Sequence, residues 1–246
     1  MSQWIEGRVV ANHAWTARLH SLQVEADIAP FAAGQFIRLG LMVDGAEVGR
    51  PYSLVNPPQA RPLEFCFSVV PGGPLSGRLA AMRTGDALLV APRANGFLVL
   101  SEVPDCRRLW LISTGTGIGP FLSILRTDEP WRCVERVVLV HAVRLATELI
   151  YRDAIEEIAA ARGEQFAYVP FVSREATDFA LSGRIPNAIA DGSLEARAGA
   201  AFDAQSHVML CGNPQMVADA EAALVTRGLR KHRRREPGHI SVENYW

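Results

Sequence analysis

The sequence has no apolar run close to the roughly 20 residues that a membrane-spanning helix needs, so we expect no membrane span. Residues Met1–Arg8 lack a basic stretch followed by an apolar one, which predicts no secretion signal and a cytoplasmic location. The four cysteines lie far apart without C-x-x-C spacing, so we expect free thiols and no metal or iron–sulfur site. With a formal net charge of −1 and no recognisable motif, nothing indicates nucleic-acid binding.

The apolar content, 49% of 246 residues, is enough for one or two domains with large cores. The first hundred residues contain short β-branched and aromatic runs between glycine- and proline-rich turns, which is typical of an antiparallel barrel or sandwich. One short helix is expected over Leu75–Met82. The expected strands are Ile5–Ala11, Ala17–Val24, Gln35–Leu41, Ser53–Val55, Leu63–Val70 and Ala87–Ala91.

From about Arg108 the pattern changes to apolar runs that alternate with helical stretches, which predicts a doubly wound α/β domain with a parallel sheet. We therefore expect one domain over residues 1–100 and a second over 106–246. The expected strands are Leu109–Ser113, Arg136–Ala142, Phe166–Val172 and His207–Cys211, and the expected helices are Pro120–Leu125, Thr147–Ala161, Ile185–Ala190 and Pro214–Arg227.

Two short motifs in the first domain suit phosphate and ring binding. Arg50-Pro51-Tyr52-Ser53 combines a guanidinium that can hold a phosphate bidentately with a flat ring and a hydroxyl. Gly73-Pro74-Leu75-Ser76 opens the expected short helix, where free backbone N–H groups bind anions. Each motif alone is also compatible with an ordinary strand or turn.

The second domain has a glycine-rich turn, Thr114–Pro120, between a strand and a helix, which is the setting of a phosphate loop. Ser173 and Arg174 follow another strand, and an arginine there can pair with a ribose 2′-phosphate. The adjacent Glu175 keeps NAD open as an alternative to NADP. Arg184 follows, and Val143-Arg144 occupies a further strand end.

The last third of the chain contains three more candidates. Cys211-Gly212-Asn213-Pro214-Gln215 joins a strand to a helix, and the glycine allows a ligand close to the backbone. Tyr245 and Trp246 end the chain, and such aromatics cover either the protein's own core or a ligand. The run Arg230–Arg235 is a local positive field that suits either an acidic partner or plain solvation.

Taken in order, these motifs resemble those of the ferredoxin–NADP reductase family, in particular its bacterial flavodoxin/ferredoxin members. The resemblance covers nearly the whole chain. It implies a Greek-key antiparallel β-barrel that binds FAD, followed by an NADP-binding α/β domain. It also implies an enzyme that transfers electrons between NADPH and ferredoxin or flavodoxin.

The resemblance also assigns residues, with Ser53, Cys211, Glu243 and Tyr245 at the catalytic site. Trp246 is one residue more than plant-type reductases have, which leaves the separate roles of Tyr245 and Trp246 open. The implied FAD contacts are Arg50, Pro51, Tyr52, Ser53, Cys66, Phe67, Ser68, Val69, Pro74, Leu75, Ser76, Thr116, Tyr245 and Trp246. The implied NADP contacts are Gly115, Gly117, Val143, Arg144, Ser173, Arg174, Arg184, Asn213, Pro214 and Gln215.

An acidic ferredoxin or flavodoxin is expected to dock near Arg230, Lys231, Arg233, Arg234 and Arg235, on a monomer. Two other interpretations remain. One is an NAD(P)H-dependent flavin or cytochrome reductase on the same two domains. The other is a non-enzymatic subunit of a larger complex, which the missing cysteine cluster disfavours.

Overall fold

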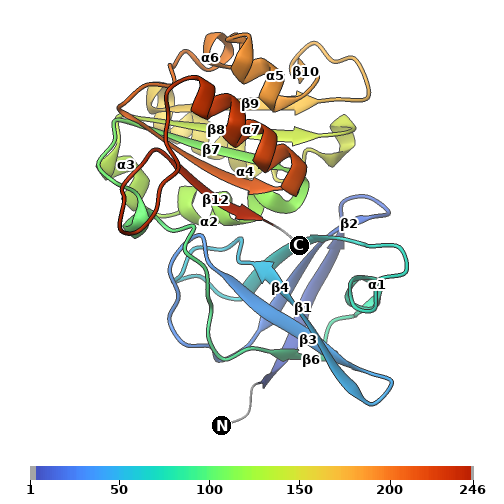
Figure 1. Cartoon of the computed structure of the whole chain (residues 1–246). Coiled ribbons are helices and arrows are strands. Elements are labelled where there is room, and N and C mark those ends of the chain that lie inside the picture. Colours follow the sequence, from blue (N-terminus) through green and yellow to red (C-terminus); the bar gives the residue numbers. More distant parts are fainter. Residues whose placement is uncertain (1–3, 245–246) are drawn as a thin grey trace. The chain divides into compact units, whose positions relative to one another are not determined.

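The computed structural model describes residues 4–244, which form two compact units (Figure 1). The first, called the barrel unit below, comprises the chain up to Val99 together with Gly119–Thr127. The second, the α/β unit, comprises Leu100–Ile118 and the chain from Asp128 onward. Among residues 4–244, no helix has the length and apolar character that crossing a bilayer requires.

The barrel unit is a six-stranded antiparallel sheet in the order β4-β3-β6-β1-β2-β5. Its two outer strands meet, because Leu54 bridges Phe65 and the N–H of Val55 donates to the carbonyl of Glu64 at 2.8 Å, so the sheet closes. Alternate residues of each strand point inward into one apolar core that includes Leu22, Leu39 and Phe65. The strands are β1 (Ile5–Ala14), β2 (Leu19–Glu25), β3 (Phe36–Val43), β4 (Ala46–Ser53), β5 (Leu63–Ser68) and β6 (Ala87–Val90).

One expected strand of this unit is wrong. Ser53 is the last residue of β4, not the first of a strand over Ser53–Val55. β4 forms a hairpin with β3 through Asp44 and Gly45, whose φ angles of 51° and 81° are those of a two-residue turn. The polar and proline-containing sequence of β4 hides it from a search for alternating apolar residues. The short helix α1 (Ser76–Ala81) lies within its expected range.

Helix α2 (Gly119–Leu125) belongs by its contacts to the barrel unit, although it directly follows a turn of the α/β unit in sequence. All seven of its residues are buried. The hydroxyl of Ser123 donates to the carbonyl of Asn56 at 2.8 Å, and Arg126, just beyond the helix, pairs with Glu64 at 3.3 Å. These contacts fix α2 against the end of β4 and the start of β5.

The α/β unit contains a six-stranded sheet in the order β10-β9-β8-β7-β11-β12, with parallel pairing throughout. One face packs its apolar residues against α5, α6 and α7, which confirms the expected doubly wound architecture. The strands are β7 (Arg108–Thr114), β8 (Arg136–Val143), β9 (Phe166–Val172), β10 (Leu181–Ser182), β11 (Ser206–Gly212) and β12 (Ile240–Asn244). The helices are α3 (Glu129–Cys133), α4 (Arg152–Arg162), α5 (Ile185–Ala190), α6 (Ser193–Ala198) and α7 (Pro214–Thr226).

The long helix expected over Thr147–Ala161 begins later, at Arg152. Tyr151 has a left-handed φ of 61°, which no helix interior accommodates, and the preceding segment Ala146–Glu148 is a separate 3-10 turn. The sequence also gave no indication of α3, α6, β10 or β12. These elements are five or six residues long or shorter, below the length at which periodicity is informative.

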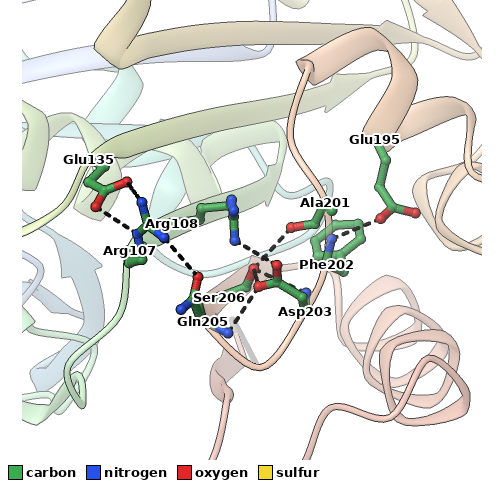
Figure 2. A network of polar contacts seen from close by, with 9 residues as sticks. All are labelled: Arg107, Arg108, Glu135, Glu195, Ala201, Phe202, Asp203, Gln205 and Ser206. Carbon is green, nitrogen blue, oxygen red and sulfur yellow. Dashed lines mark hydrogen bonds and ion pairs between the residues drawn. The ribbon is translucent and has the colours of Figure 1, made fainter.

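The amino ends of the parallel strands are tied together by charged groups (Figure 2). Arg107 binds both carboxylate oxygens of Glu135 at 2.6 Å, and Arg108 pairs with Asp203 at 2.6 Å. Asp203 in turn accepts hydrogen bonds from the Ser206 hydroxyl and the Gln205 N–H. Because these side chains are engaged with one another, we expect this network to stabilise the start of the sheet.

Candidate functional site

The carboxyl ends of β7, β8, β9 and β11 lie at the opposite edge of the sheet, where open α/β sheets bind ligands. The strand register brings the expected nucleotide residues of the α/β unit together at this edge. They are Gly115 and Gly117 after β7, Val143 and Arg144 at the end of β8, Ser173 and Arg174 after β9, and Cys211, Asn213, Pro214 and Gln215 around the end of β11.

The glycine-rich turn begins with a 3-10 turn over Gly115–Ile118, which lies against β7, β8 and β11. A Cβ on Gly117 would lie 2.7 Å from the carbonyl oxygen of Cys211 and 2.9 Å from Cα of Gly212. Those are backbone atoms that cannot move aside, so only glycine fits. Gly212 has a φ of 129°, and a Cβ there would meet Thr114 Oγ1 at 2.3 Å. The two glycines therefore allow two loops to approach each other closely at the strand ends.

Asn213 connects this turn to helix α7. Its N–H donates to Thr114 Oγ1 at 2.9 Å, and its side-chain oxygen accepts from the N–H groups of Gln215 and Met216 at 3.0 and 3.2 Å. Pro214 occupies the first helical position, where a missing N–H costs nothing. The positive end of this 13-residue helix therefore lies beside the glycine-rich turn, which favours an anion there.

The segment after β9 is held by backbone contacts. Both the N–H and the hydroxyl of Ser173 donate to the carbonyl of Val143 at 3.1 Å, and the N–H of Arg174 donates to the carbonyl of Arg144 at 2.9 Å. Arg174 is exposed, and so is Arg184, the residue that precedes α5. These guanidinium groups are thus displayed by a fixed backbone.

Glu175 is in contact with the backbone of a neighbouring loop. Its carboxylate accepts a hydrogen bond from the N–H of Ala146, across the loop that follows β8. Glu148 similarly accepts from the N–H groups of Arg144 and Leu145 at 2.9 and 3.1 Å. Both carboxylates organise the loops of this edge, so Glu175 is engaged by the protein's own backbone.

Two residues that the sequence did not single out belong to this edge. His141 is buried in β8, and its Nε2 lies 2.9 Å from the carbonyl oxygen of Gly115. Phe179 packs against Val143 and Val172, with the Arg152 guanidinium 5.2 Å from its ring centre. A histidine in an apolar strand is usually a core residue, and the 2.9 Å contact across strands is what distinguishes this one.

Cys211 and Glu243 lie opposite each other on adjacent strands β11 and β12. Cys211 is fully buried. Glu243 Oε1 is buried and has no hydrogen-bond partner among the residues that the structure describes. Burial raises the pKa of this carboxyl to about 7. Tyr245 and Trp246, expected at the same site, lie outside the described residues.

In the barrel unit, the expected flavin residues come together at the ends of β4 and β5. Tyr52 on β4 packs edge-on against Phe67 on β5, with ring centres 5.8 Å apart, and burial raises the pKa of Tyr52 to about 12. His20 stacks on Phe67 at 5.7 Å. Ser53 is buried, whereas Arg50 is exposed and donates to the carbonyl of Gly49 at 2.8 Å. Pro51 lies between them on β4.

The rest of the barrel set is placed by β5 and α1. Cys66 is buried on β5, and burial, assisted by Glu64, raises the pKa of its thiol to about 12, so it is an inert thiol. Ser76 is buried, and its hydroxyl accepts from the N–H of Val70 at 2.9 Å, which joins α1 to the end of β5. Phe67 and Ser68 end β5, and Val69, Pro74 and Leu75 lie on the connection to α1. Thr116, also expected to contact FAD, is part of the 3-10 turn of the α/β unit.

Comparisons with known proteins agree with this arrangement. Residues 111–222 match the oxidoreductase NAD-binding domain family. Over the full length of both chains, the protein is 47% identical to a flavodoxin/ferredoxin–NADP reductase of Shigella flexneri and 46% identical to that of Escherichia coli strain K12. A crystal structure of a ferredoxin NADP+ reductase from Neisseria gonorrhoeae with bound FAD and NADP superimposes with a TM-score of 0.95. It is 33% identical, and both chains are covered completely.

Proposed function

The chain belongs to the flavodoxin/ferredoxin–NADP reductase family, and on this basis we propose that it is an FAD-containing oxidoreductase that transfers electrons between NADPH and ferredoxin or flavodoxin. Apart from the family, one observation carries the proposal. At the carboxyl edge of the sheet, Gly117 and Gly212 have no room for a Cβ, beside the start of a 13-residue helix. Backbone that is held this tightly, at the carboxyl edge of the sheet and beside the start of a helix, suits the close approach of a diphosphate.

The barrel unit fits a flavin nucleotide. The exposed Arg50 can bind phosphate bidentately, and the Tyr52 and Phe67 rings form an aromatic wall at the ends of β4 and β5. The buried Ser53 adds a hydroxyl to the same end of β4. The chain would hold FAD on these groups together with the connection Cys66–Ser76.

The α/β unit fits NADP(H). Arg174 and Arg184 would bind the ribose 2′-phosphate, and the half-buried Phe179 near the ends of β8 and β9 offers a ring for base stacking. Since Glu175 is engaged with the N–H of Ala146, it is not the acidic residue that NAD binding uses at a strand end. NADPH is therefore the expected donor.

Held by Arg50, Tyr52 and Ser53, FAD would supply the exchange between hydride and single-electron transfer, which is chemistry that no side chain supplies. The protein's own groups orient NADPH and FAD, and they accept or donate a proton. Burial raises the pKa of the Glu243 carboxyl to about 7, so this group can both accept and donate a proton near neutral pH. Cys211 is a neutral, compact wall beside it and needs no nucleophilic role.

The basic segment Arg230–Arg235 precedes β12 and therefore lies at the amino edge of the sheet. It is separated from the glycine-rich turn by the length of a seven-residue strand, about 20 Å. Arg234 pairs with Glu102 at 3.1 Å and Lys231 with Glu221 at 3.0 Å. Arg233 lies 3.9 Å from Glu236. Arg230 and Arg235 are exposed, with no ion pair among the described residues. The segment therefore suits long-range attraction of an acidic carrier.

Charge reversal tests this role. Arg235→Glu and Arg230→Glu change free charges without breaking an ion pair, and we expect a several-fold lower kcat/KM for carrier reduction at low salt. Turnover of ferricyanide with NADPH should not change. Arg83→Glu, in the exposed turn before β6, is the matched control. Equal effects of all three variants, or none at low salt, would refute the role of the segment.

The central proposal is tested by the absorbance spectrum of the purified protein. We expect a yellow protein whose flavin absorbance is bleached by NADPH without oxygen, and far more slowly by NADH. Arg174→Ala should remove most of this preference, because it removes a guanidinium that NADPH alone requires. Ferredoxin or flavodoxin should be reduced faster than free flavin. A colourless protein that takes up no FAD would refute the proposal.

A further inference from the structure

The buried histidine of β8 occupies a position that stability alone does not favour. His141 follows Val137, Val138, Leu139 and Val140, all of which are fully buried, in the centre of the parallel sheet. Its Nε2 contacts the carbonyl oxygen of Gly115 at 2.9 Å, while its Nδ1 is buried and has no hydrogen-bond partner among residues 4–244. A buried polar atom without a partner destabilises the fold by about 1–3 kcal/mol, which an apolar side chain would avoid.

The protonation of His141 follows from its one contact. A carbonyl oxygen only accepts, so Nε2 carries the proton and donates it. Burial lowers the pKa of the ring to about 4, against the effect of the Gly115 carbonyl, and the ring is therefore neutral at pH 7. His141 is thus a fixed hydrogen-bond donor and takes no part in proton transfer at neutral pH.

This donor acts on the first peptide of the glycine-rich turn. The carbonyl of Gly115 and the N–H of Thr116 belong to one rigid trans peptide and point in opposite directions. When the carbonyl points at His141, the N–H of Thr116 must point away from β8. Gly115 has a φ of 52°, and the position of a Cβ there has no atom within 4 Å, so no side-chain packing at this residue adds to the hold on the peptide.

The turn is therefore held from two sides by different means. On the β11 side, packing against Cys211 and Gly212 fixes Gly117. On the β8 side, the hydrogen bond from His141 adds a side-chain donor to the Gly115 carbonyl, which also accepts within the 3-10 turn. We infer that His141 is a positioning residue: it fixes the Gly115–Thr116 peptide in the orientation against which the diphosphate of NADP(H) binds. The inference rests on the proposed function.

The sheet offers a matched control. His207 on β11 is also buried, burial also lowers its pKa to about 4, and its Nε2 also makes one hydrogen bond, to Ser241 Oγ at 2.9 Å. In the register of β7, however, His207 lies opposite Leu109 near the amino edge, whereas His141 lies opposite Ser113 near the carboxyl edge. Equivalent substitutions at the two histidines separate a general loss of packing from an effect on the turn.

The inference is tested by measuring, with calorimetry, how tightly two ligands bind to the FAD-loaded protein. NADP+ has the diphosphate, whereas adenosine 2′-monophosphate has the 2′-phosphate and no diphosphate. In His141→Leu we expect NADP+ to bind about 5- to 10-fold more weakly, the equivalent of one neutral hydrogen bond. Affinity for adenosine 2′-monophosphate should change by less than about 2-fold. His141→Gln should restore NADP+ affinity, because its amide N–H reaches as far as Nε2.

His141→Asn should behave like His141→Leu, because its amide is too short to reach the carbonyl of Gly115. If His141→Leu does not fold, His141→Asn is used in its place. His207→Leu and His207→Gln should leave both affinities unchanged. Equal weakening of both ligands, unaltered NADP+ affinity in His141→Leu and His141→Asn, or the same selective loss at His207 would each overturn the inference. If the unaltered protein bound neither ligand, the proposed function itself would be wrong.

Discussion

Replacing Gly117 by alanine is the sharpest test of the nucleotide turn. The added Cβ would lie 2.7 Å from the oxygen and 2.9 Å from the carbon of the Cys211 carbonyl, and 2.9 Å from Cα of Gly212. Since ordinary contacts to carbon are about 3.5 Å or longer, the turn must move by about 0.5–1 Å. Overpacking of this kind costs about 1–3 kcal/mol of unfolding free energy.

A displacement of about 1 Å at a binding site reduces catalysis by up to roughly 100-fold. We therefore expect Gly117→Ala to raise KM for NADPH at least about 10-fold in the ferricyanide assay, with the flavin spectrum unchanged. Gly115→Ala is the matched variant, because its Cβ meets no atom within 4 Å and only its φ of 52° is unfavourable. An unaltered KM in Gly117→Ala would refute the reasoning from crowding.

Three further predictions concern stability. Burial lowers the pKa of His207 to about 4, so below about pH 6.5 the unfolded chain binds a proton that the folded protein does not. Between pH 7 and pH 5, the free energy of unfolding of His207→Gln, measured in urea, should therefore fall by about 2 kcal/mol less than that of the unaltered protein. Glu243→Gln should show the opposite sign. As the pH falls, the Glu243 carboxyl with its pKa of about 7 takes up a proton in the folded protein at a higher pH than in the unfolded chain, which stabilises the unaltered protein. The free energy of unfolding of Glu243→Gln should therefore fall by about 2 kcal/mol more over the same range. Asn213→Ala should cost about 1 kcal/mol by removing the cap of α7, and Asn213→Asp should restore it. If the difference in unfolding free energy between a variant and the unaltered protein did not change with pH, the argument for His207 or Glu243 would be wrong. If Asn213→Ala were as stable as the unaltered protein, the argument for the cap would be wrong.

The two-unit architecture could be predicted from the sequence because its signals are local. Apolar runs separated by helical stretches indicate a parallel sheet wherever they occur, and β7, β8, β9 and β11 were found at their expected places. The role of the glycine-rich turn could also be predicted, because glycines in this number between a strand and a helix are typical of a phosphate-binding loop. Short, polar elements such as β4 and β12 could not, because their pairing partners, not their own residues, make them strands.

The contacts that orient the site lie beyond the reach of sequence patterns. Glu175 is next to Arg174 in the sequence, where it suggests NAD, yet its carboxylate binds the N–H of Ala146, 29 residues away. His141 has the sequence setting of a core residue, and only the register between β7 and β8 shows that it meets Gly115. Both facts depend on which strands are neighbours, which is a property of the fold and not of the local sequence.

A parallel sheet has two chemically different edges, and this chain uses them differently. At the amino edge, Arg107 and Arg108 are engaged with Glu135 and Asp203, so the polar groups there satisfy one another (Figure 2). At the carboxyl edge, the strand ends carry crowded glycines, exposed arginines and a buried carboxyl oxygen that has no hydrogen-bond partner among residues 4–244. Substitutions of Arg107 or Arg108 should therefore change the unfolding free energy at constant KM for NADPH, and substitutions of the exposed Arg174 or Arg184 should change that KM at nearly constant stability.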